Sequence, residues 1–272
     1  MAFDGYAHPK HVEDRSDCFF YHSIDLPEAG AVPGIWDLRP GVESYLGGVD
    51  FKGKRVLELG CANGFLTFQM ERRGAEVVGV DLSESDSWDV VPYASVDYDR
   101  EMAVRRNHIR QLNNAFWLGH RLTESGARVL YGGVYQIPPE AGPFDVCTVG
   151  SILLHLRDPF LALHRALSIT RETVVVTDMR SRYDILPRVG LSRLLPKKLR
   201  RPSMRFIPDY RTGFPRDTWW RLNPDIVTHF LGVLGFEDVR VSFHRQIFKG
   251  RYLPLFTVVG RRTKGEALCV PG

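Results

Sequence analysis

The sequence predicts an α/β fold built on a mostly parallel sheet, and three observations carry that prediction. First, residues 55–81 have the pattern of a strand, a glycine turn, a helix and a second strand that ends on an acid, the layout of a nucleotide-binding βαβ unit. Second, short β-branched runs alternate with amphipathic helical patterns along the residues that follow. Third, residues 236–245 and 252–261 have the pattern of two strands joined by a Lys249-Gly250 turn, which predicts a closing antiparallel hairpin.

Length and composition suit one enlarged globular domain. The chain has 272 residues, of which 44% are hydrophobic and 25% charged. No apolar run approaches the about 18 residues of a membrane span, and the amino terminus lacks a signal-peptide pattern. The four cysteines are scattered without a C-x-x-C pair. We therefore expect no metal site and no disulfide framework, and a cytoplasmic location.

The first βαβ unit begins with residues 55–59, a hydrophobic run typical of a buried parallel strand. The glycine turn that follows lets the backbone approach a ligand closely. Residues 65–73 are predicted to form the helix, whose free N–H groups favour an anionic group on the ligand. Asp81 ends the second strand about 20 residues past the turn, where a carboxylate can accept ribose hydroxyls.

The spacing of the glycines separates two cofactor classes. A dinucleotide fold requires G-x-G-x-x-G, and that spacing fails because Gly60 is followed by Ala62 and Gly64. Instead, Glu58 stands two residues before the first glycine. The pattern resembles motif I of the class I S-adenosylmethionine (AdoMet) methyltransferases, E/D-x-G-x-G-x-G, with Ala62 in place of the middle glycine.

This resemblance implies a Rossmann-like sheet of seven strands with a closing antiparallel hairpin, and S-adenosyl-L-methionine as the methyl donor. The family uses the loop for the methionine carboxylate, so Glu58 is expected to face the ammonium through water and Asp81 to hold the ribose. An ordinary crossover with incidental glycines is the alternative. The resemblance assigns to the cofactor site Glu58, Gly60, Cys61, Ala62, Asn63, Gly64, Asp81, Leu82, Gly133, Val134 and Ser151.

A second resemblance covers most of the chain. Residues 20–40, FYHSIDLPEAGAVPGIWDLRP, are similar to the opening of methyltransferases grouped with the tRNA wobble-uridine 5-oxyacetic acid methyltransferases. The likeness continues through residues 150–159 and 219–224. It implies the same fold and donor but leaves the methyl acceptor open.

Residues 1–54 precede the βαβ unit as an added segment, and the methyltransferase domain is predicted over residues 55–262. The aromatic part of the added segment is expected to cover the cofactor and exclude water, with Tyr21 and Trp36 on the acceptor side. Plain packing against the sheet is the alternative. The tail, residues 263–272, is expected to be flexible.

The adenine side of the site is less well defined by the sequence. Trp88 follows the ribose acid and is placed either against the adenine or at the surface. A helix is predicted over residues 105–125 and a strand over 128–130. Gly133 stands where many class I enzymes carry an acid for the adenine amino group, so that contact would come from backbone or from a neighbour.

Ser151 and His155 follow the predicted central strand, residues 144–151, close to the expected sulfonium. A neutral imidazole works as a base near physiological pH, so His155 is the first candidate for a general base and His22 the second. Lining the pocket without proton transfer is the alternative role for His155.

Residues 180–221 form a basic insertion, predicted to be a lid, in which twelve Lys or Arg face three Asp. Arg180 and Trp219 are assigned to the acceptor. The lid is suited to an acidic acceptor, to RNA phosphates with aromatic stacking, or to an anionic membrane surface, and a solvated face without function is equally compatible.

The sequence therefore predicts O-methylation of a hydroxyl on a small-molecule or saccharide-type acceptor, with an acidic acceptor favoured by the lid. The alternatives are a tRNA wobble-uridine methyltransferase or carboxymethyltransferase and a non-catalytic AdoMet-binding protein. We expect neither a DNA partner nor a membrane span.

Overall fold

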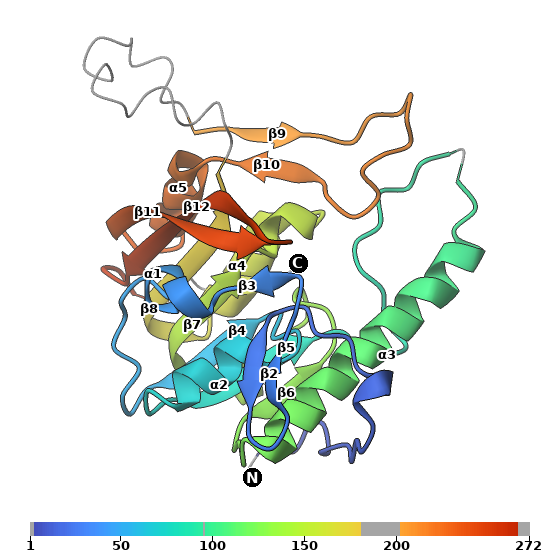
Figure 1. Cartoon of the computed structure of the whole chain (residues 1–272). Coiled ribbons are helices and arrows are strands. Elements are labelled where there is room, and N and C mark those ends of the chain that lie inside the picture. The colour runs from blue at the N-terminus through green and yellow to red at the C-terminus, as the bar shows by residue number, and fades with distance from the viewer. Residues whose placement is uncertain (1–2, 95, 181–201, 266–272) are drawn as a thin grey trace.

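The structure, a computed structural model, describes residues 3–94, 96–180 and 202–265. Its centre is an eight-stranded sheet in the order β3-β11-β12-β8-β7-β4-β5-β6 (Figure 1). The strands from β8 to β6 in that order pair in parallel, whereas β3, β11 and β12 pair antiparallel. The strands are β3 (Trp36–Asp37), β4 (Arg55–Leu59), β5 (Glu76–Asp81), β6 (Arg128–Tyr131), β7 (Phe144–Gly150), β8 (Thr170–Met179), β11 (Asp238–Phe248) and β12 (Arg251–Arg261).

The predicted α/β class and the closing hairpin are confirmed, but the count of seven strands is wrong by one. The eighth strand is β3, which pairs Trp36 and Asp37 with the end of β11. A strand of two residues has too short a pattern to be read from the sequence. It forms because β11 offers an edge to the added segment.

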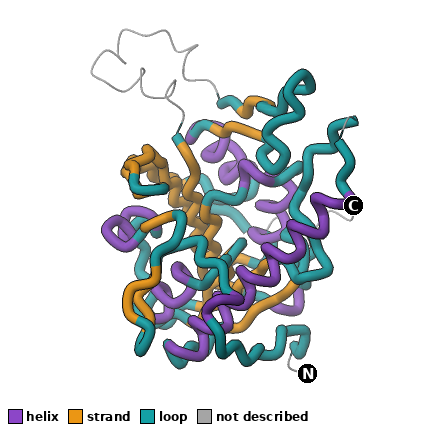
Figure 2. Tube along the Cα trace, turned by 45° about the vertical axis from the view of Figure 1, so that its right-hand side comes forward, coloured by secondary structure: helices purple, strands orange, loops and turns teal. Residues whose placement is uncertain are grey.

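Helices cover both faces of the sheet, as Figures 1 and 2 show. Val56 and Leu57 are neighbours in β4 and join different hydrophobic clusters, because successive strand residues point to opposite faces. The added segment, α2 and α3 pack on one face, and α4 and α5 on the other. The helices are α1 (Val42–Tyr45), α2 (Phe65–Glu71), α3 (Asp99–Leu122), α4 (Pro159–Leu167) and α5 (Pro224–Val233), and the short 3-10 turns are η1 (Arg15–Asp17), η2 (Arg39–Gly41), η3 (Pro139–Ala141) and η4 (Leu153–His155).

Helix starts follow local rules where a capping residue is present. Asn223 accepts a hydrogen bond from the N–H of Ile226 and is followed by Pro224 at the first position of α5. Helix α3 differs, because it begins at Asp99 and not at residue 105. Its first turns are polar and contact a distant segment through Glu101, so they lack the apolar spacing that marks a helix in sequence.

The added segment packs mainly into the core. It forms a small hairpin of β1 (Ile24–Leu26) and β2 (Gly30–Val32) against the α2 and α3 face. Most of its large apolar side chains are buried.

Residues 202–222, called the β9–β10 arm below, contain a two-stranded antiparallel sheet of β9 (Met204–Phe206) and β10 (Trp220–Leu222). Figure 1 shows this arm beyond the end of the main sheet, with its connecting loop reaching toward the start of α3. The remainder of the basic insertion, 181–201, and the end of the tail, 266–272, lie outside the described residues. In the part of the chain that the structure describes, no helix combines the length and apolarity needed to cross a membrane.

Candidate active site

A cavity of about 520 Å³ lies at the carboxyl ends of the parallel strands. It is lined by the turn after β4, the end of β5, residues 86–89, one face of α3 and the loops after β6 and β7. Tyr21 and Asp217 contribute from the added segment and from the β9–β10 arm. Strand order reverses between β4 and β7, and this switch point is where open α/β sheets bind ligands. The volume of the cavity falls in the range of about 300–1,000 Å³ that is typical of small-molecule sites.

Asp81 is fixed at the floor of the cavity by the backbone around it. Its carboxylate accepts hydrogen bonds from the N–H of Ala62 at 2.7 Å and the N–H of Leu82 at 2.8 Å. The thiol of Cys61 donates a third, long bond at 3.6 Å. A carboxylate has about four acceptor positions, so one remains for a ligand. Burial raises the pKa of Asp81 and the two backbone bonds oppose that rise.

The glycine turn requires a left-handed backbone at three positions: φ is +77° at Gly60, +49° at Ala62 and +81° at Gly64. A Cβ added at Gly64 would lie 2.5 Å from the ring of Phe68, so the third position also needs glycine for space. Ala62 adopts the left-handed region despite its Cβ, at the place of the family's middle glycine. This turn brings Gly60 and Ala62 to the cavity wall.

Four residues assigned to the cofactor stand behind the cavity wall and do not line it: Glu58, Cys61, Asn63 and Gly64. Glu58 is buried and accepts a hydrogen bond from the hydroxyl of Thr67, and burial raises its pKa to about 8. The side chain of Asn63 exchanges two hydrogen bonds with the main chain of His22. These groups hold the turn in place and tie it to the added segment.

Residues 86–89 form a wall that the motif did not define. Trp88 lines the cavity, with the guanidinium of Arg105 5.3 Å from the centroid of its indole ring. Asp89 also lines it and accepts hydrogen bonds from the hydroxyl of Tyr135 and the N–H of Arg157. Gly133 and Val134, which the sequence assigned to the cofactor site, also line the cavity. Sequence reasoning missed Asp86, Asp89, His108 and Gln136, because loop and helix positions without a motif give no such signal.

His155 lines the cavity from η4, directly after β7. Its Nδ1–H donates a hydrogen bond to the carbonyl oxygen of Asp217 in the β9–β10 arm. A carbonyl accepts only, so Nδ1 carries a proton in this bond and Nε2 is the ring nitrogen left for proton exchange. Ser151 lines the same wall with a φ of +51°, and its hydroxyl lies 3.2 Å from that of Tyr45. The carbonyl of Asp217 therefore orients the imidazole of His155 in the cavity wall.

Of the other residues predicted on the acceptor side, one lines the cavity and four do not. Tyr21 lines the cavity, whereas His22, Trp36, Arg180 and Trp219 do not. His22 is 7% exposed, and burial lowers its pKa to about 4, so its imidazole is held in the core. The indole N–H of Trp219 donates to the carbonyl oxygen of Asp89 and so supports the wall from behind. Arg180 lies over the ring of Phe243 on β11.

The charge of the lining is negative. Asp81, Asp86, Asp89 and Asp217 line the cavity, and no Lys or Arg does so within the described ranges. Such a lining favours a cation and disfavours a pyrophosphate, whose charge would repel the carboxylates. The cavity therefore suits a positively charged nucleoside better than a dinucleotide.

Comparison with known proteins identifies the family. The family model described as a methyltransferase domain matches residues 38–222. Two ubiquinone biosynthesis O-methyltransferases are similar: that of Alkalilimnicola ehrlichii is 28% identical over 123 residues, covering 45% of this chain and 39% of the relative. That of Hahella chejuensis is 33% identical over 107 residues, covering 39% of this chain and 34% of the relative. The match thus spans well under half of either relative.

Among solved structures, the N-terminal domain of EvdMO1, crystallised in the presence of SAH and D-fucose, is similar in fold. It aligns with a TM-score of 0.52 at 17% identity, covering 90% of this chain and 91% of that chain. Nothing in these matches singles out the wobble-uridine branch. The match of the family model to most of the chain shows that this protein belongs to the methyltransferase domain family.

Proposed function

We propose that this protein transfers a methyl group from AdoMet to a hydroxyl of a small-molecule or saccharide-type acceptor. The observation that carries the proposal is one cavity with an acidic lining that holds two oriented groups, the backbone-anchored carboxylate of Asp81 and the imidazole of His155, whose Nδ1–H is bonded to a backbone carbonyl.

The residues present fit AdoMet. Its sulfonium and ammonium outweigh its one carboxylate, so the net charge is positive, which the four lining aspartates favour. Asp81 has an acceptor position left for a ribose hydroxyl, and Trp88 offers an apolar face for the adenine. Gly132 and Gly133 leave open space there, since an added Cβ would meet nothing within 4 Å. When bound, AdoMet supplies a methyl group that its sulfonium has already activated.

The chain contributes position and a proton acceptor. The walls hold the two reactants in one orientation and exclude water, a source of large rate gains when the geometry is fixed. His155 takes the proton of the acceptor hydroxyl at Nε2, and its Nδ1–H remains bonded to the carbonyl of Asp217, which stabilises the imidazolium. Serving as base in this way contributes a factor of about 10²–10⁴ in rate. His22 is left out of this scheme because it does not line the cavity.

The acidic lining also changes the expected acceptor. An acidic acceptor was expected from the basic insertion, yet the described arginines of that insertion do not line the cavity. We therefore infer a neutral hydroxyl compound. The name of the O-methyltransferases that match part of the chain supports oxygen as the acceptor atom.

The test begins with calorimetric titration of the protein with AdoMet, its demethylated product and NAD. We expect the first two to bind and NAD not to bind. A labelled-methyl screen then compares neutral phenols and saccharides with carboxylated and phosphorylated analogues. Binding of NAD alone, or turnover confined to the anionic acceptors, would contradict the proposal.

A tRNA acceptor remains the second candidate because of one surface. Tyr210 and Phe214 on the β9–β10 arm are 79% and 68% exposed, with Arg211 over the Tyr210 ring. Exposed aromatic rings beside arginine suit the stacking of unpaired bases. Binding of bulk tRNA that weakens steeply with added salt would favour this candidate, and turnover of a free small acceptor independent of salt would exclude it.

A further inference from the structure

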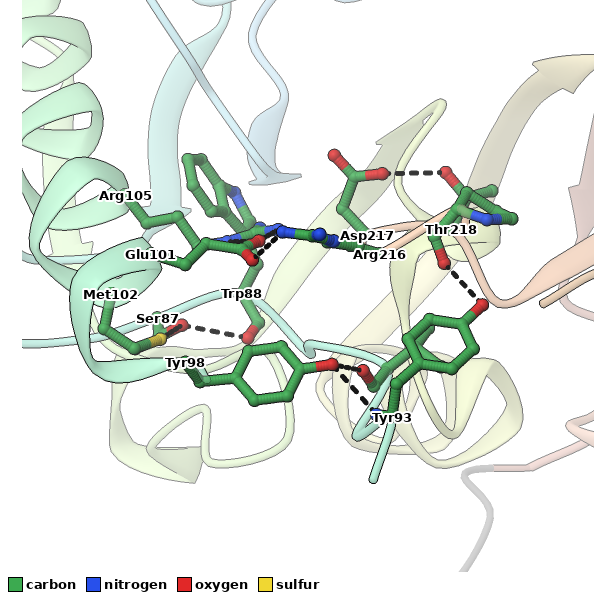
Figure 3. Close-up of polar contacts among 12 residues, drawn as sticks. Ser87, Trp88, Tyr93, Tyr98, Glu101, Met102, Arg105, Arg216, Asp217 and Thr218 are labelled. Carbon is green, nitrogen blue, oxygen red and sulfur yellow. Dashed lines mark hydrogen bonds and ion pairs between the residues drawn. The ribbon is translucent and has the colours of Figure 1, made fainter. Parts of the chain in front are cut away.

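Glu101 forms ion pairs with two arginines, Arg105 and Arg216, and each of these arginines is connected to a different part of the cavity lining. Glu101 lies in the first turns of α3, and its carboxylate is 17% exposed. One of its oxygens accepts from Arg105, with a distance to Nε of 3.0 Å, and the other accepts from Nη1 of Arg216 at 2.6 Å. Figure 3 shows the two guanidiniums meeting at this carboxylate.

Arg105 contacts Trp88, which lies in the part of the cavity lining proposed to hold the cofactor. The guanidinium of Arg105 is 5.3 Å from the ring centroid of Trp88, and the arginine side chain is 11% exposed. It forms an ion pair with Glu101 on the preceding helical turn. The orientation of this guanidinium, and with it the support behind the indole, therefore depends on Glu101.

Arg216 directly precedes the part of the cavity lining that carries Asp217 and His155. The next residue, Asp217, lines the cavity and accepts the Nδ1–H of His155 at its carbonyl. Two further bonds hold this part of the β9–β10 arm against residues 91–93. The carbonyl of Arg216 accepts from the N–H of Val91 at 2.9 Å, and the carbonyl of Pro215 accepts from the hydroxyl of Tyr93 at 3.1 Å.

We propose that Glu101 is a positioning residue that couples the Trp88 wall to the wall carrying Asp217 and His155, so that the cofactor side and the base side of the site move as one unit. This inference rests on the proposed function. A carboxylate shared by two guanidiniums has a fixed geometry, because each of its oxygens is aimed at a different partner. Burial raises the pKa of Glu101, but the hydrogen bonds from Arg105 and Arg216 outweigh it and lower the pKa, which keeps the bridge ionised.

Three substitutions separate the two ion pairs of Glu101, that with Arg105 and that with Arg216, which together form the bridge. Arg105→Gln disturbs only the Trp88 side, and we expect the AdoMet dissociation constant to rise at least about fivefold with kcat at saturating AdoMet nearly unchanged. Arg216→Gln disturbs only the His155 side, and we expect kcat to fall at least about tenfold with AdoMet affinity retained. Glu101→Gln cannot accept from both guanidiniums at full charge, so both quantities should change together.

The matched control is Glu172→Gln. Glu172 also forms an ion pair, with Nζ of Lys54 at 2.6 Å, but it lies at the start of β8 and does not line the cavity. If Glu101 acted only on overall stability, the three variants at Glu101, Arg105 and Arg216 would lose active fraction without the split between AdoMet affinity and kcat. A Glu101→Gln protein that matches Glu172→Gln in both quantities would overturn the proposal.

Amide hydrogen exchange gives a readout that needs neither cofactor nor acceptor. We expect Glu101→Gln to speed exchange in peptides covering residues 88–98 and 209–219 at least about tenfold relative to Glu172→Gln, because the arm opens more often. Unchanged exchange in both peptides would refute the bridge even if the protein proved not to bind AdoMet. Failure of the unaltered protein to bind AdoMet, with faster exchange in Glu101→Gln, would instead refute the proposed function and leave the bridge standing.

Discussion

Replacing Asp81 by Asn tests the cofactor side of the site with little change in volume. The carboxylate accepts from the N–H groups of Ala62 and Leu82, one on each oxygen. An amide has one oxygen and one NH₂, so its NH₂ must face one of these donors, and the charge toward the ribose is lost. A hydrogen bond to a charged group contributes about 1.5–3 kcal/mol. We therefore expect AdoMet to bind about 10–100-fold more weakly to Asp81→Asn.

Isothermal titration at one neutral pH measures this change directly. The matched control is Asp145→Asn, because Asp145 also accepts a backbone N–H, from Arg55 at 2.8 Å, at the start of β7 and so at the opposite end of the sheet. Distant sites act nearly independently, so AdoMet affinity should stay within about twofold in the control. The reasoning fails if Asp81→Asn unfolds cooperatively and still binds AdoMet as tightly as Asp145→Asn does.

Three further outcomes are expected. His155→Asn should lower kcat about 100-fold or more with AdoMet affinity within about threefold, and single-turnover rates with a labelled methyl group would settle it. Burial raises the pKa of Glu58 from 4.5 to about 8, so the folded chain keeps a proton that the unfolded chain releases. The stability from this group is present below about pH 4.5 and is lost as pH rises toward 8, by about 1.4 kcal/mol per pH unit. Urea unfolding across that range should show this slope in the unaltered protein relative to Glu58→Gln, and parallel curves would refute it. Gly64→Ala should destabilise by about 2 kcal/mol or more, because φ is +81° and the ring of Phe68 is too close. Gly232→Ala on α5 meets nothing within 4 Å and should leave stability equal or slightly higher, as thermal unfolding would show.

Much of the fold follows from local sequence rules. The βαβ unit, its glycine turn and Asp81 were predictable because strand burial, left-handed backbone and a carboxyl-terminal acid each leave a short-range pattern. The cap at Asn223 and the Lys249-Gly250 turn follow short-range rules of the same kind. Both Lys249 and Gly250 have a positive φ. The family resemblance through motif I rested on the same residues.

The candidate site was only partly predictable. Gly60, Asp81 and His155 line the cavity, whereas Glu58 and Asn63 stand behind it although the motif includes them. A motif records which residues occur near a ligand in a family, but it does not distinguish a side chain on the wall from one that supports the wall. That distinction depends on which way each side chain is packed.

What the sequence by itself determined was the class of fold, the turn that approaches the ligand and the acid beneath it, because these arise from residues close together in the chain. The tertiary structure alone decided the protonated nitrogen of His155, the acidic lining and the bridge at Glu101. His155 and Asp217 are 62 positions apart, and Glu101 and Arg216 are 115 apart. Contacts over such separations depend on how the arm and α3 are placed on the sheet, and no short-range pattern encodes that placement.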